Sequence, residues 1–173
     1  FGQNGYYNYT PPSAATTHAA VGAHQTVNLT SAANVSTANL SLAAQTRTGL
    51  VSSITYDATN GAAVSGGSSG NRLDDLELMT LTFASGAYAQ GVQGVRFTLT
   101  SGSSTEPITY TVYHIDGREL GQVTSAGNAF TSNDLSAFTN VGKITILADS
   151  AAAVRVQQVE FDPVNNNPVG ATA

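Results

Sequence analysis

The stretch ITYTVYHIDGREL, residues 108–120, decides the fold class. Apolar and polar residues alternate over Ile108–Ile115, as expected for a strand with one buried face. A second run, Glu119–Thr124, follows after Asp116 and Gly117. Asp and Gly tolerate the backbone conformations that a tight turn requires, so the stretch predicts an antiparallel β-hairpin.

The same alternation continues on both sides of this hairpin. In Val95–Thr100, the side chains of Val95, Phe97 and Leu99 share one face of the predicted strand. Further predicted strands are Val51–Tyr56, Leu76–Phe83, Lys143–Ala148 and Val154–Phe161. Convincing helical periodicity is absent, and 133–140 could form only one short helical turn. The sequence therefore predicts an all-β fold, an antiparallel β-sandwich or jelly roll.

The domain organisation follows from length and composition. A chain of 173 residues has the size of one domain. Residues 14–50 are rich in Ala, Thr, Ser and Asn and are expected to supply one or two strands. Prolines and asparagines after Phe161 are typical of a stiff exit segment. We therefore expect one sandwich domain over residues 1–163 and a linker to a following domain over residues 164–173.

Composition and charge exclude several classes of function for this chain. Only 10% of residues are charged, so neutral polar residues must cover the surface, as in many extracellular domains. The absence of cysteine excludes disulfides, thiolate metal sites and a thiol nucleophile. A net charge of −5 argues against nucleic acid as a partner. No apolar run reaches the roughly 18 residues of a membrane helix, so we expect no membrane insertion. We also expect the domain to be monomeric.

Four segments then indicate a family. They are NRLDDLELMTLTF (71–83), VQGVRFTLTS (92–101), ITYTVYHIDGRELG (108–121) and VGKITILADSAAAVRVQQVEFDP (141–163). Over roughly residues 65–170 the chain resembles the ligand-binding β-sandwich domains of long bacterial RTX (repeats-in-toxin) adhesins, and its tail resembles the linkers between their tandem repeats. The resemblance implies a calcium-stabilised domain at the bacterial cell surface, with neighbouring domains in the same chain.

The densest acidic group is Asp74, Asp75 and Glu77, which follows the Gly-rich loop 66–71. Calcium takes six to eight oxygen ligands from carboxylates, carbonyls and waters, at about 2.3–2.6 Å. These three residues are the first predicted calcium ligands. The alternative is a solvated acidic loop that keeps a sheet edge soluble.

A second acidic pair lies near the end of the last predicted strand. Glu160 and Asp162 flank Phe161 and project from the face opposite its ring. Two like charges on one face gain from a shared cation, which would also tie this strand to the N-terminal segment. Both are therefore predicted metal ligands. The alternative is an ordinary exposed strand face.

Three residues are candidates for ligand contact. Tyr6 and Tyr7 could stack on the C–H faces of sugars, or could instead pack in the core as part of a first strand. Arg72 could donate to a sugar hydroxyl or a peptide carboxylate, or could pair with Asp74. His18 and His24 are expected to be exposed side chains rather than metal ligands, and His114 is expected to lie on the hairpin.

Together these features predict a calcium-assisted module of a bacterial surface adhesin that binds an extracellular glycan or peptide. The alternative is a structural spacer of an extracellular stalk or filament, without a ligand of its own. We expect no enzymatic activity, because no nucleophile elbow is evident and no carboxylate pair is singled out for glycoside hydrolysis.

Overall fold

The computed structural model describes residues 19–66, 72–74, 76–100, 107–125, 133–148 and 154–168. Antiparallel strands dominate these ranges, which confirms the predicted all-β fold. The elements are β1 (Ala19–Val21), β2 (Gln25–Asn28), α2 (Ala32–Thr37), β3 (Leu40–Gln45), β4 (Val51–Ser52), β5 (Ile54–Asp57), β6 (Gly61–Val64), β7 (Leu78–Phe83), β8 (Val92–Thr100), β9 (Ile108–His114), β10 (Glu119–Thr124), β11 (Asn133–Asp134), β12 (Val141–Ala148) and β13 (Arg155–Pro168).

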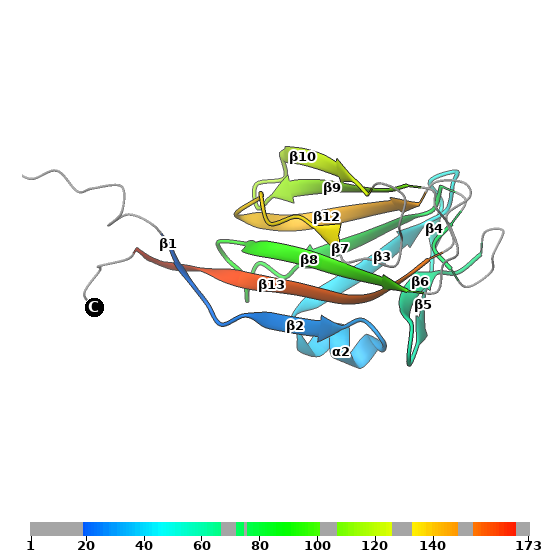
Figure 1. The fold of residues 1–173 in the computed structure, drawn as a ribbon, viewed down its shortest axis with the longest axis horizontal. Helices are drawn as coiled ribbons and strands as arrows, with labels where there is room; N and C mark the ends of the chain where they lie inside the picture. The colour runs from blue at the N-terminus through cyan, green and yellow to red at the C-terminus, as the bar shows by residue number, and fades with distance from the viewer. Residues whose placement is uncertain are drawn as a thin grey trace, which may run out of the picture.

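The strands form the two layers of a sandwich (Figure 1). In one layer the order is β4-β3-β7-β12-β9-β10. In the other, β13 lies between β8 and a group formed by β1, β2 and β6. A single bridge between Val141 and Val92 joins β12 to β8 and connects the layers. Within the described ranges no helix is long and apolar enough to span a membrane.

Side chains from the facing strands fill the space between the layers. Val95, Phe97 and Leu99 are all buried, as the alternation in β8 predicts. The Phe97 ring stacks on the Tyr110 ring of β9, with 5.3 Å between centroids. The two layers therefore share one apolar core, with an aromatic contact between β8 of one layer and β9 of the other.

Strand β13 holds the second layer together. One of its edges pairs with β8, while the other pairs with β6, β2 and β1. The strand continues to Pro168, past the linker boundary expected from the sequence. Pro163 has no N–H to donate, but its carbonyl oxygen accepts the Gly22 N–H, at 2.6 Å.

The two ends of the sandwich differ. At one end Ala19 of β1 lies opposite Pro168 of β13, so the chain enters β1 and leaves β13 side by side. At the other end, where β13 begins, Leu73 bridges to Val154. The residues that follow Leu73 form the acidic turn described next, so this turn lies near the beginning of β13, whereas Ala19 and Pro168 pair at its other end.

Candidate functional site

The acidic turn, residues 74–77, is closed by two reciprocal hydrogen bonds. The Glu77 N–H donates to the Asp74 carbonyl oxygen (2.9 Å), and the Asp74 N–H donates to Glu77 Oε2 (3.1 Å). Between them Leu76 has a φ of 62°, in the left-handed region that a leucine rarely adopts. The Leu76 N–H donates to the carbonyl oxygen of Ala148 (3.0 Å), which fixes the turn on β12.

Both described carboxylates of the turn are buried. Asp74 is 2% exposed and Glu77 is 1% exposed, so the interpretation as a solvated loop is wrong for these two residues. Buried carboxylates are costly unless hydrogen bonds, cations or protons compensate them. Their oxygen atoms are the ligands that calcium prefers, so the donor set fits this ion. Asp75, the third predicted ligand, lies outside the described residues, and the calcium site stays a prediction.

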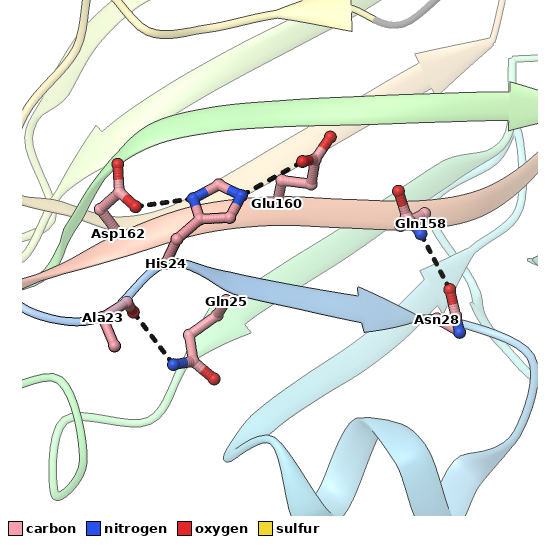
Figure 2. Close-up of polar contacts among 7 residues, drawn as sticks. All are labelled: Ala23, His24, Gln25, Asn28, Gln158, Glu160 and Asp162. Atoms are coloured by element: carbon pink, nitrogen blue, oxygen red, sulfur yellow. Dashed lines mark hydrogen bonds and ion pairs between the residues drawn. The ribbon is translucent and has the colours of Figure 1, made fainter.

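A second cluster, the histidine clasp, consists of His24, Glu160 and Asp162 (Figure 2). His24 Nδ1 lies 2.7 Å from Asp162 Oδ1, and His24 Nε2 lies 3.1 Å from Glu160 Oε1. Both ring nitrogens can donate only when the imidazole is doubly protonated. When it is doubly protonated, the His24 ring therefore joins the segment before β2 to β13 by donating to both carboxylates.

The surroundings of the clasp favour the charged ring. The pKa of His24 is raised above 6.5, first by the hydrogen bond to Asp162 and then by the one to Glu160. Gly94 makes room for the Asp162 carboxylate, because a Cβ there would lie 2.7 Å from Asp162 Oδ2. The nearby cation, Arg96, is paired with Asp134 at 3.2 Å.

The clasp bears on the predicted metal site at Glu160 and Asp162. The two carboxylates both contact the His24 ring, which comes from the N-terminal side of the chain. Among the described residues, no three His, Asp or Glu side chains form a group that could hold a metal ion. Calcium at this pair stays a prediction, and the ion would have to displace His24.

The clasp makes a prediction about pH. In an NMR titration we expect His24 to titrate above 6.5. Because the folded-state pKa is raised, the stabilisation is fully present below pH 6.5 and is lost as the pH rises through the folded-state value. The double variant Glu160→Gln, Asp162→Asn should return His24 to its ordinary pKa. A wild-type His24 that titrates at 6.5 or below would contradict the clasp.

Of the three predicted ligand-contact residues, the structure describes Arg72 alone. Tyr6 and Tyr7 lie outside the described residues. Arg72 is described and is exposed, just before the acidic turn. Its roles in ligand contact or in pairing with Asp74 stay predictions.

Sequence reasoning missed His24 as part of a site. Its partners lie 136 and 138 residues further along the chain. No local sequence pattern predicts which strands will pair with β13. The one available signal was the Glu160 and Asp162 pair, which requires a cation in a chain with only six Lys and Arg residues.

Comparison with known proteins assigns no family. The sequence matches no protein-family model, and no curated protein matches it. One similar solved structure is a chain from work on Bacillus endospore appendages, described as a novel family of disulfide-linked pili. It covers 91% of this chain and 100% of its own length, with 12% identity and a TM-score of 0.38. Similarity at this level identifies neither a family nor a function.

Proposed function

We propose that this chain is a pendant, non-catalytic module of a bacterial surface protein. By pendant we mean that the sandwich is attached by one end and presents the other. The observation that carries this proposal is the antiparallel pairing of β1 with the end of β13, where Ala19 lies opposite Pro168. The remote end then carries the acidic turn.

This arrangement also bears on mechanical load. A force applied to Ala19 and Pro168 would separate β1 from β13 one residue pair at a time, because it acts along the hydrogen bonds between the strands. Strands that separate one residue pair at a time resist little force, so this attachment suits a module that transmits tension along a stalk poorly. The pairing therefore favours a side lobe or a head domain.

The finer proposal is calcium-assisted binding of an extracellular carbohydrate or peptide. Its support is the position and burial of Asp74 and Glu77, at the end that a pendant module presents. A calcium ion held by carboxylate oxygens of these residues would supply free coordination positions for vicinal hydroxyls or a carboxylate of the ligand. The resemblance to RTX adhesin domains points in the same direction.

A second candidate is a structural module of an extracellular stalk or filament, without a ligand of its own. The observation that favours it is the pairing of β13 with β1, β2, β6 and β8, which ties the N-terminal strands to the rest of the sandwich.

Binding panels separate the two candidates. We expect the fluorescently labelled chain to bind members of a glycan array or a peptide array in millimolar calcium, and to lose that binding in chelator. The double variant Asp74→Asn, Glu77→Gln is the matched control, since it keeps the side-chain shapes but removes both charges. An absence of binding on both arrays would favour the structural module. Binding that persists in chelator and in the double variant would refute the role of calcium.

A further inference from the structure

A pocket of about 360 Å³ lies between the loop after β7, the tip of the β9–β10 hairpin and the beginning of β12. Phe83, Tyr88 and Ile115 supply apolar surface to its lining. His114 and Lys143 are the lining residues that can carry a positive charge, and none of the described residues that line it is acidic. A cavity of this volume can hold a small organic molecule.

The aromatic part of the lining is held in place by contacts outside the pocket. Tyr88 donates its hydroxyl hydrogen to the Ala38 carbonyl oxygen, at 2.6 Å. The Tyr88 ring also packs edge to face against Phe83 and Phe161, with 6.0 and 5.4 Å between ring centroids. Because these contacts exist without a ligand, binding would order few side chains and would cost little entropy.

The hairpin side of the pocket is tied to β12. The Ile115 N–H donates to the Asn140 carbonyl oxygen, at 3.0 Å. Gly142 allows this close approach, because a Cβ there would lie 2.9 Å from the Cα of Ile115. Ile115 is 41% exposed, which is unusual for a large apolar side chain of this protein. A ligand with an apolar body would remove part of that surface from water.

Lys143 is the only lysine in the chain, and its charge is not neutralised by a carboxylate. In the described part of the chain the ion pairs involve histidines and arginines but not Lys143. Its ammonium instead lies 4.4 Å from the centroid of the Tyr113 ring, a contact that positions the positive charge without cancelling it. An unpaired ammonium in the lining of an apolar pocket favours an anionic ligand.

His114 offers a second donor from the same lining. Its Nδ1 accepts the Asp116 N–H at 3.2 Å, which leaves the proton of the neutral ring on Nε2. The doubly protonated ring, which can pair with the Asp116 carboxylate at 3.1 Å, also carries a proton on Nε2. Nε2 is therefore a donor in both states of the ring.

We propose that this pocket binds a small organic acid with one carboxylate and an apolar body. The carboxylate would accept hydrogen bonds from Lys143 and His114, and the body would lie against Tyr88 and Ile115. One fixed positive charge matches one negative charge, which favours a carboxylate over a phosphate dianion.

This site is separate from the acidic turn. Gly142 and Lys143 lie at the beginning of β12, whereas the acidic turn is fixed to Ala148 at its end. Binding of the acid needs no calcium, so the proposal goes beyond the function proposed above and can fail or succeed independently of it.

The first test uses phenylacetate as the probe, followed by NMR on the isotope-labelled chain in the presence of chelator. We expect saturable shifts of the Ile115 and Gly142 amide signals at millimolar phenylacetate. Phenylacetamide, which lacks the charge, and acetate, which lacks the apolar body, should each bind at least about tenfold more weakly. Equal affinity for phenylacetate and phenylacetamide, or no shift at millimolar phenylacetate, would overturn the proposal.

A pair of variants tests the role of the lysine. Lys143→Met keeps the apolar stem and removes the charge, so it should weaken phenylacetate binding by about tenfold or more and leave phenylacetamide binding unchanged. Arg118→Met is the matched control, since it removes one positive charge from the hairpin but lies outside the pocket lining. Equal weakening by the two variants would assign the effect to the general charge of the chain and would refute the site. Thermal melting checks that both variants fold.

The same ligand chemistry occurs at the C-terminus of a peptide, so acetyl-glycyl-phenylalanine is the second probe. Tighter binding of phenylacetate would identify a free acid as the ligand, and tighter binding of the peptide would identify a chain terminus. In both cases the proposal requires that Lys143→Met weakens the tighter probe, and an unchanged affinity would contradict it.

Discussion

Gly61→Ala should destabilise the chain by about 3 kcal/mol or more, because it combines a steric clash with backbone strain. Gly61 opens β6 at a φ of 100°, a conformation that alanine rarely adopts. A Cβ built there would overlap the carbonyl oxygen of Val156 and the Cα of Gln157, both rigid parts of β13. Neither β6 nor β13 can move away without loss of the pairing between them. Urea denaturation measures the loss.

Gly117→Ala is the matched control for this experiment. Gly117 also has a positive φ, 95°, in the turn between β9 and β10, but a Cβ there would meet no atom within 4 Å. It should therefore show the backbone strain alone, about 1–2 kcal/mol. Equal losses for the two variants would mean that the close approach of β6 to β13 is not what requires glycine at position 61.

Phe161→Ala should cost about 3–5 kcal/mol, a large share of the 5–15 kcal/mol that stabilises a typical domain. The Phe161 ring is fully buried and meets two other rings edge to face, Phe83 at 5.0 Å and Tyr88 at 5.4 Å. Truncation would leave a cavity between the layers and remove both ring contacts. Denaturant melts at constant pH provide the measurement.

Phe161→Leu serves as its control, since it keeps most of the buried volume and should lose clearly less than the alanine variant. Because Glu160 and Asp162 flank this ring, the His24 titration in the Leu variant reports whether the clasp survives. A loss below about 1 kcal/mol for Phe161→Ala would contradict the central place of this ring in the core.

Local sequence signals predicted most of the fold. The hairpin around Asp116 and Gly117 is confirmed, and Gly117 carries the expected positive φ. Asp57 and Asp134 accept hydrogen bonds from backbone N–H groups two or three residues ahead, as Asp residues in turns commonly do, and these bonds help to lower their pKa values. The alternation of apolar and polar residues and the residues that favour turns are local features of a few neighbouring positions, so a single sequence is enough to recognise them.

Features that depend on distant partners could not be predicted. Residues 14–50 supply β1, β2 and β3 as well as α2, which has one buried residue, Val35, and therefore no visible helical period. Instead of a helical turn, 133–140 contains β11, which pairs with β8. The end of β13 became a strand because β1 was available to pair with it.

The candidate site was predictable only in part. The carboxylates of Asp74 and Glu77 stand out in a chain with few charges, but they are buried in a turn in which Leu76 takes a left-handed conformation. No sequence pattern predicts that conformation for a leucine. The same conformation ends the extended backbone, so β7 begins at Leu78 and not at Leu76 as predicted. The His24 clasp could not be predicted without knowing that β2 pairs with β13.

The most direct test of the account is a calcium titration by calorimetry on the wild type and on the Asp74→Asn, Glu77→Gln variant. Glu77→Gln keeps an oxygen that can accept the Asp74 N–H, so the variant should stay folded. We expect the wild type to bind calcium, with stabilisation of about 2.7 kcal/mol at one hundred times the Kd, and the variant to bind none. Absence of heat and of any change in Tm for a folded wild type at millimolar calcium would contradict the account.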